Sequence, residues 1–151
     1  MNVSDVVELL INQSCVDVNV QDEYGLTPMS KAATWGYSRI IDILARAGAD
    51  PDIASIFGET PVHMAALWGY TDAVKALAET GANIDKKGGL NGSTPLMVAV
   101  FFGYKDVVEY LLKQGLDINA HDIHDKTALY WVRWSNHRAI AKLLRAFGAT
   151  L

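Results

Sequence analysis

The sequence is poor in cysteine and has no long apolar run. It contains one cysteine, Cys15, among 151 residues, so an intramolecular disulfide and a cysteine-rich metal site are both excluded. No apolar run approaches the ~18 residues that suggest a membrane span, and no signal peptide opens the chain. These absences predict an intracellular protein, cytoplasmic or nuclear, without a transmembrane segment.

Positive charge is scarce over most of the chain and concentrated at one end. The net charge is −4, which argues against general affinity for nucleic acid. Residues 1–122 hold 8 basic and 16 acidic residues, a net charge of −8, whereas residues 123–151 hold 5 basic residues and 1 acidic residue, a net charge of +4. Two interpretations of this basic end stay open: a solvated terminal helix pair or a docking patch.

The most regular feature of the chain is a repeated dipeptide. Its copies recur at intervals of 33, 34 and 33 residues: Thr27-Pro28, Thr60-Pro61, Thr94-Pro95 and Thr127-Ala128. Nine residues after each Thr stand Gly36, Gly69, Gly103 and Asn136, and 21 residues after it stand Gly48, Gly81, Gly115 and Gly148. A register this regular predicts one supersecondary unit that is copied four times and stacked into a solenoid.

Each part of the repeat has a physical reason. A Thr side chain can cap the start of a helix, and proline is tolerated in the first helical turn, where its missing N–H would have had no partner. The spacing of Val107-Val108 and Leu111-Leu112 places four apolar residues on one face of a second helix. The glycines that follow supply a left-handed residue that ends this helix. Each unit is therefore expected to run as turn, helix, reversal, helix and loop.

These units resemble the ankyrin repeat. The best copy runs from Gly58-Glu-Thr-Pro-Val-His-Met-Ala-Ala66 to Gly81-Ala-Asn-Ile-Asp85, and its first part is similar to the T-P-L-H-x-A-A signature of that family. The resemblance covers about Asp5 to Leu151 and implies an all-α ankyrin-repeat solenoid of stacked helix-turn-helix units joined by β-turn-like loops. We place a single domain at 1–151. It holds a partial N-terminal unit at 1–21 and full units at about 22–54, 55–88, 89–121 and 122–151.

The two ends depart from the repeat pattern. Arg133 stands where the inner units have Ala33 and Ala66, and burying an unpaired arginine is costly, so the last unit is predicted to be a cap with Arg133 exposed. The N-terminus matches only a second helix, near Asp5–Asn12, and the segment 14–16 is one residue longer than its equivalent. Either a lone helix caps the array or the chain is a fragment of a longer protein.

No cluster in the sequence predicts catalysis. The run 121–125, His-Asp-Ile-His-Asp, has metal-ligand residue types but offers too few ligands for a closed tetrahedral site. His63 occupies the histidine of the repeat motif, which predicts a structural hydrogen bond. The segment 86–92 holds the residue that lengthens one period, but it lacks phosphate-loop spacing, so we interpret it as a loop insertion. We predict no enzyme activity, no cofactor and no metal.

The resemblance also implies where a partner binds. In ankyrin arrays the contacting positions are usually the turn tips and the last two residues of the first helix. At the helix ends these positions hold Trp35, Leu67, Trp68, Phe101, Phe102 and Trp134. At the turn tips they hold Tyr24, Leu26, Ile56, Phe57, Leu90 and Ile123. Three tryptophans and three phenylalanines stand where polar residues would be expected if nothing bound, and we expect the helix-end residues to form one apolar stripe.

The sequence therefore predicts a non-catalytic protein–protein interaction module. Its concave surface would receive an apolar or aromatic-rich segment of a partner protein. Three alternatives remain open: the aromatic residues pad the space between turns and helices, the stripe or the N-terminal helix closes a homo-oligomer, or the chain is an engineered ankyrin-type binder. The residues that follow the mid-unit glycines are predicted to pack between units rather than bind: Tyr37, Tyr70, Tyr104 and His137.

Overall fold

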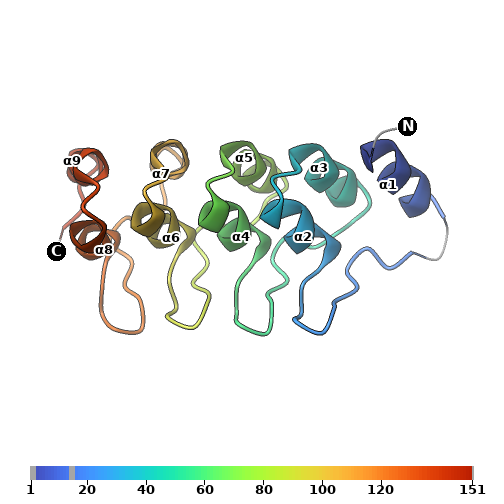
Figure 1. Cartoon of the computed structure of the whole chain (residues 1–151), viewed down its shortest axis with the longest axis horizontal. Coiled ribbons are helices and arrows are strands. Elements are labelled where there is room, and N and C mark those ends of the chain that lie inside the picture. Colours follow the sequence, from blue (N-terminus) through green and yellow to red (C-terminus); the bar gives the residue numbers. More distant parts are fainter. Residues whose placement is uncertain (1–2, 14–15, 151) are drawn as a thin grey trace.

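The computed structural model describes residues 3–13 and 16–150, and within them the chain forms nine helices and almost no β-structure (Figure 1). A first helix, α1 (Val3–Ile11), stands alone. Four pairs follow: α2 (Pro28–Thr34) with α3 (Ser38–Arg46), α4 (Pro61–Trp68) with α5 (Thr71–Glu79), α6 (Pro95–Phe102) with α7 (Lys105–Leu112), and α8 (Ala128–Ser135) with α9 (Arg138–Ala146). The predicted all-α repeat architecture is confirmed. Ser14 and Cys15 lie outside the described residues.

The helices stand in two parallel rows (Figure 1). The first helices of the pairs, α2, α4, α6 and α8, contact one another in order and form the first-helix row. The second helices α3, α5, α7 and α9, preceded by α1, form the second-helix row. The loops that connect one pair to the next project beyond the first-helix row, on the side away from the second helices. We call their tips, residues 22–26, 55–59, 88–93 and 122–126, the turn loops.

The start of each first helix follows the repeat chemistry. The helices begin at Pro28, Pro61, Pro95 and Ala128, as predicted, each after an extended and buried Thr. The Thr27 hydroxyl accepts a hydrogen bond from the backbone N–H of Ser30 at 3.1 Å. The Thr94 hydroxyl accepts one from Met97 N–H at 3.3 Å. These bonds satisfy N–H groups that the helix itself leaves without a partner.

His63 ties the start of α4 to the next unit. Its Nδ1 accepts hydrogen bonds from the Thr60 backbone N–H at 3.2 Å and the Thr60 hydroxyl at 2.8 Å. Its Nε2 then carries the proton and donates to the carbonyl of Ser93 at 3.0 Å. Burial lowers the pKa of His63, because a charged ring loses its hydration there. The predicted structural role of this histidine is confirmed.

The mid-unit glycines receive aromatic rings from the following unit. A Cβ added to Gly36 would lie 2.7 Å from the ring of Tyr70, and Gly69 and Gly103 meet Tyr104 and His137 in the same way. All three glycines have positive φ, so they also supply the left-handed turn between the two helices. Tyr70, Tyr104 and His137 therefore pack between units, as predicted, whereas the equivalent Tyr37 is 51% exposed.

The loops that leave the second helices are braced across units. In each case a side-chain oxygen accepts a hydrogen bond from a backbone N–H about one repeat further on. The backbone N–H groups and the side chains that accept from them are Asp50 with Asn19 at 2.8 Å, Asn83 with Asp52 at 3.0 Å, Asp117 with Asp85 at 2.9 Å, and Thr150 with Asn119 at 2.8 Å. These bonds hold successive loops at a constant spacing, since a short Asn or Asp side chain recurs at the same register position.

The core lies between the two helix rows. Paired small residues let the first helices approach closely, and they are almost fully buried: Ala32-Ala33, Ala65-Ala66 and Ala99-Val100. The second helices contribute the larger side chains, including Val107, Val108 and Leu111, none of which is exposed to solvent. In the last unit Arg133 stands where the other first helices have Ala33, Ala66 and Val100, and its side chain is exposed, as predicted.

The inserted residue of the third turn loop is accommodated by glycine. Backbone bonds close the other loops between residues four apart, as from Ser55 N–H to the Glu59 carbonyl, whereas here Gly88 N–H reaches the carbonyl of Ser93. Gly88 is buried, and an added Cβ would strike the Gly58 carbonyl oxygen and the His63 ring. The insertion is therefore packed against the preceding unit.

Candidate partner-binding surface

Short polar side chains shape the turn loops. The Asp22 carboxylate accepts hydrogen bonds from the backbone N–H groups of Tyr24 and Leu26, both at 2.9 Å. The Asp122 carboxylate does the same for His124 at 2.8 Å and Lys126 at 3.0 Å. Such local bonds replace backbone partners in a tight turn. They leave the side chains at the tips free to point outward.

Neighbouring turn loops are joined through their backbones. The N–H of Ile56 donates to the carbonyl of Tyr24, and the N–H of Ile123 donates to the carbonyl of Asn91, both at 3.0 Å. The Gln21 side-chain amide also donates to the carbonyl of Ala54 at 3.2 Å. The first two tips and the last two tips are therefore joined in pairs, and each bond fixes the spacing of the two tips that it joins.

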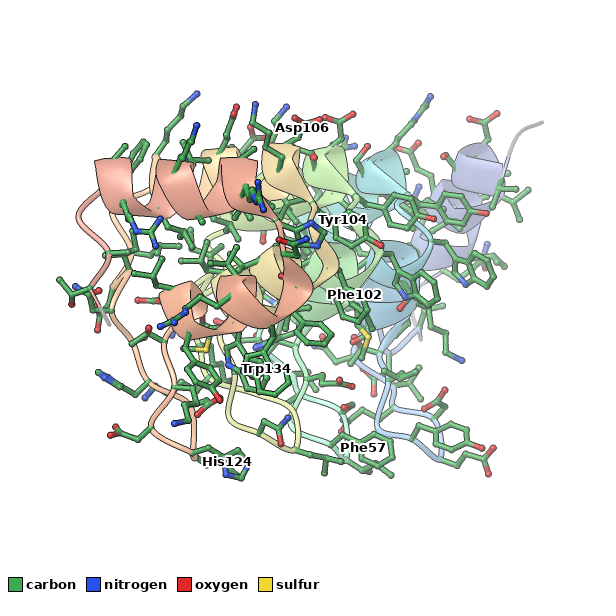
Figure 2. The ribbon with its side chains drawn as sticks, turned by 60° about the vertical axis from the view of Figure 1, so that its left-hand side comes forward. Phe57, Phe102, Tyr104, Asp106, His124 and Trp134 are labelled. Atoms are coloured by element: carbon green, nitrogen blue, oxygen red, sulfur yellow. The ribbon has the colours of Figure 1, made fainter. Side chains whose placement is uncertain are left out.

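The predicted site residues fall into two rows. The turn loops expose Tyr24, Ile56, Phe57, Leu90 and Ile123, and the ends of the first helices expose Trp35, Trp68, Phe101, Phe102 and Trp134. Figure 2 shows Phe57 at a turn tip and Trp134 and Phe102 further up, beside the first helices, while Asp106 lies at the far side on the second-helix row. The two rows flank one face of the molecule.

Leu26 and Leu67 differ from the other predicted positions. Both are only partly exposed, and Leu26 packs against the hydrophobic core. Two hydrogen bonds to Asp22 also fix the Leu26 backbone. Its N–H donates to the Asp22 carboxylate, and its carbonyl accepts from the Asp22 N–H at 3.1 Å. Leu26 therefore supports the turn loop, and it offers a partner less surface than Tyr24 does.

The expected stripe is continuous only near α6 and α8. There the Phe101 ring meets Phe102 edge-on at 5.2 Å between centroids, and Trp131 at 5.8 Å. Phe102 in turn stacks on Tyr104 at 6.2 Å. Among the residues that the structure describes, no ring contact joins Trp35 to Trp68.

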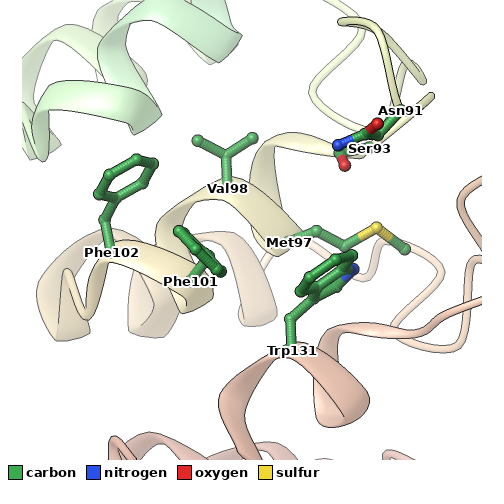
Figure 3. Close-up of a pocket in the computed structure, with 7 residues that line it drawn as sticks. All are labelled: Asn91, Ser93, Met97, Val98, Phe101, Phe102 and Trp131. Atoms are coloured by element: carbon green, nitrogen blue, oxygen red, sulfur yellow. The ribbon is translucent and has the colours of Figure 1, made fainter. Parts of the chain in front are cut away.

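A groove opens beside this aromatic cluster (Figure 3). It has a volume of about 250 Å³ and is lined by Asn91, Ser93, Met97, Val98, Phe101, Phe102 and Trp131. We call it the aromatic groove. Phe101 and Trp131 approach each other from α6 and α8, while Asn91 and Ser93 stand at the turn-loop end (Figure 3). The groove is mainly apolar, with polar groups at one edge.

Trp131 is the functional candidate that the sequence reasoning missed. Its indole N–H donates to the Asp122 carboxylate at 3.0 Å, and its ring is half-buried. In the first unit Lys31 occupies the same register position and binds Asp22 at 2.8 Å. The sequence could have pointed to Trp131, because its register position lies on the same helix face as the helix-end residues. The other units hold Lys31, Met64 and Val98 at this position.

Few charges border the aromatic groove. Lys126 lies 4.5 Å from the centre of the Tyr130 ring, which contacts Trp131 edge-on at 5.5 Å. In the second turn loop Glu59 is partly covered, and this burial raises the pKa of its carboxyl group. The residues that line the aromatic groove carry no charge, so an apolar partner segment would cover no charged group there.

The histidine-rich turn loop shows no metal geometry. His121 Nε2 lies 4.0 Å from an Asp125 oxygen, and the Asp122 carboxylate is already bound to the turn backbone and to Trp131. Within residues 3–13 and 16–150 no group of three His, Cys, Asp or Glu side chains is placed to hold a metal ion. No helix in the described part of the chain is both long and apolar enough to cross a bilayer.

Comparison with known families agrees with this architecture. A family model of ankyrin repeats in three copies matches residues 39–122 and, again, residues 87–150. These matches cover more than half of the chain, and the chain belongs to the ankyrin-repeat family. Members of this family generally act as protein–protein interaction modules and are typically non-catalytic. A search of curated proteins finds no match.

Proposed function

We propose that the chain binds an apolar or aromatic-rich segment of a partner protein, without a catalytic step, on a concave surface formed by its turn loops and first-helix ends. The observation that supports this proposal is the aromatic groove, in which Phe101 and Phe102 are close to half-exposed beside Trp131. Exposed apolar patches of this kind are rare on proteins that bind nothing.

The energy available at this surface is large. A fully covered aromatic side chain buries about 150–250 Å², and Trp35, Trp68, Phe101, Phe102 and Trp134 each keep close to half or more of their surface exposed. Covering these five rings would contribute on the order of 10 kcal/mol before the costs of association are subtracted. Asn91 and Ser93, at the edge of the aromatic groove, would bind backbone groups of the partner.

The proposal is tested by selecting peptides from a random library on the immobilised chain. We expect the selected peptides to be rich in aromatic and aliphatic residues. Phe101→Ala and Trp68→Ala should each weaken their binding by about 2 kcal/mol or more, the usual threshold of a binding hot spot. Phe147→Ala is the matched control, because Phe147 is as exposed as Phe101, at 45% against 43%, but follows α9. Equal losses in all three variants would contradict the proposal.

Trp68 also decides between a binding surface and internal padding. Its side chain is 54% exposed, so Trp68→Ala should lower the free energy of unfolding by less than about 1 kcal/mol. A padding residue would cost about 3–5 kcal/mol when replaced by alanine. Denaturant unfolding of this variant measures the difference, and a loss in the upper range would remove Trp68 from the proposed surface.

Self-association is the second candidate, and the observation that favours it is the apolar face of α1. Val6 and Leu10 are 41% and 57% exposed, whereas their equivalents in α7, Val107 and Leu111, are 0% exposed because α6 covers them. Two copies that met through α1 would cover this face. Light scattering at rising concentration would then show a dimer that Leu10→Glu abolishes, and a constant monomer mass would exclude this candidate.

A further inference from the structure

The end of the molecule formed by α8 and α9 carries a second groove of different chemistry. It has a volume of about 420 Å³, and Val132 and Ala141 provide its apolar part. Its other lining residues are Asn136 and four cations: Arg133, Arg138, Lys142 and Arg145. We call it the basic groove. The four cationic side chains are all exposed.

The cations of the basic groove have no acidic partner in the described part of the chain. Elsewhere lysines on the helices are paired, as in Lys105 with Glu109 at 3.0 Å and Lys75 with Asp72 at 3.3 Å. One unit later, Arg138 stands at the position of Lys105 and Lys142 stands at the position of Glu109. A second cation therefore replaces the carboxylate. From Lys126 to Leu151 the sequence contains no Asp or Glu at all.

Two of these cations occupy positions that inner units use for stacking. Arg133 corresponds to Val100, which is fully buried, and Arg145 corresponds to Leu112, which is 6% exposed. A surface that covered this end would remove water from both guanidinium groups, and an unpaired charge is costly to bury. Any partner that docks here must therefore supply carboxylates or other anions, and arginine binds a carboxylate in a bidentate, directional way.

We propose that the basic groove binds an acidic segment of a partner protein, with an apolar side chain of that segment against Ala141, the partly exposed apolar residue of the groove. A peptide fits better than a bilayer or a nucleic acid, because the anionic charge of those polymers extends well beyond the groove. There it would meet the rest of the chain, where residues 1–122 carry a net charge of −8, and be repelled. The basic groove lies at the end of the solenoid, and its occupancy does not depend on the aromatic groove.

The test measures fluorescence anisotropy of a labelled peptide of alternating glutamate and leucine against the whole chain. We expect saturable binding that weakens as ionic strength rises. The double variant Arg133→Glu/Arg145→Glu should weaken it about tenfold or more, since two charge pairs are reversed. The matched control, Lys87→Glu/Lys113→Glu, makes the same charge change at exposed lysines elsewhere and should leave binding nearly unchanged. Circular dichroism checks folding, and Arg133→Gln/Arg145→Gln provides a milder variant.

Four outcomes would overturn the proposal. The first is no binding of the peptide, and the second is an equal loss in the control variant. The third is tighter binding of phosphatidylserine vesicles or of a single-stranded oligonucleotide than of the peptide, because that would assign the groove to another class of ligand. The fourth is concentration-dependent self-association that Arg133→Gln/Arg145→Gln abolishes, because the occupant would then be the acidic region of a second copy.

Discussion

The inner units and the two ends use the same register positions in different ways. In α7 Val107 and Leu111 are fully buried, whereas in α1 the equivalent Val6 and Leu10 are about half-exposed. The residue types are nearly the same, and the difference is the presence of a first helix on the same unit. In a solenoid each unit is buried by its neighbours. An apolar residue at a stacking position is therefore a core residue only if the neighbouring helix is present.

The α8–α9 end differs from the inner units in residue type instead. Arg133 replaces residues that the inner units bury, and Arg145 replaces the buried Leu112 and the partly buried Ala45 and Ala78, so a charged groove lies where the inner units have apolar residues. One end thus keeps apolar residues without a cover, and the other substitutes charge. The four predictions below test this comparison between inner and terminal positions.

The largest expected difference is between two leucines in equivalent positions. Leu111→Ala should lower the free energy of unfolding by about 2–5 kcal/mol, because it leaves a cavity in a closely packed core. Leu10→Ala should cost less than about 1 kcal/mol, since half of that side chain already faces solvent. Denaturant unfolding measures both. Similar losses would mean that α1 is packed as tightly as the inner helices.

The next prediction compares two left-handed glycines, one that packs against the following unit and one that faces open space. Gly69 and Gly81 have φ values of +74° and +88°, so alanine at either costs about 1–2 kcal/mol of backbone strain. An added Cβ at Gly69 would also strike the Tyr104 ring, whereas nothing lies within 4 Å at Gly81. Gly69→Ala should therefore destabilise by about 1–3 kcal/mol more than Gly81→Ala. Thermal unfolding of the two variants would show no gap if Tyr104 moves aside freely.

A smaller effect is expected from pH at His63. Burial lowers its pKa, so the unfolded chain, in which histidine titrates near ~6.5, takes up the proton first. The stabilisation by neutral His63 is therefore complete above about pH 6.5 and is lost as pH falls below it. Protonation would also place a hydrogen on Nδ1, which accepts from Thr60.

Unfolding measured from neutral to mildly acidic pH checks this prediction. His63→Gln should flatten the dependence of stability on pH in that window. His124→Gln is the control, since solvent surrounds the exposed His124 side chain in both folded and unfolded chains. If both variants retain the full slope, the acid sensitivity comes from other groups.

The smallest effect is expected at Arg133. Its side chain is exposed and makes no ion pair with any residue that the structure describes, so Arg133→Ala should change the free energy of unfolding by less than 1 kcal/mol, as surface substitutions usually do. A loss of several kcal/mol in denaturant unfolding would show that the guanidinium group is buried and paired, and would remove the contrast with Val100.

Much of the fold could be read from local chemistry. Thr27 and Thr94 were predicted as caps, and the left-handed glycines as helix ends, because these features depend on residues a few positions apart in the sequence. Asn136 takes the left-handed conformation that replaces glycine, with φ of +56°. The exposure of ten of the twelve predicted surface residues also followed from register, since equivalent positions in stacked units face the same way.

The contacts of Trp131 could not be predicted from the sequence in this way. Its position was visible in the repeat register, but its bond to Asp122 and its contact with Phe101 depend on how α8 lies against α6 and the turn loop. The aromatic groove is made of residues from two units and a turn loop, and no local pattern states the distance between them. The partial burial of Leu26 likewise depends on the closure of its turn over the core.

The sequence by itself determined the repeat, the starts of the four first helices, the all-α class and the excess of positive charge at one end. These are properties of short segments, fixed by capping, glycine conformation and apolar spacing. Only the tertiary structure decided which equivalent residues are covered, which aromatic rings meet, and that four cations line one groove without acidic partners. The physical reason is that burial and charge pairing depend on neighbours in space, and in a stacked array those neighbours come from other units.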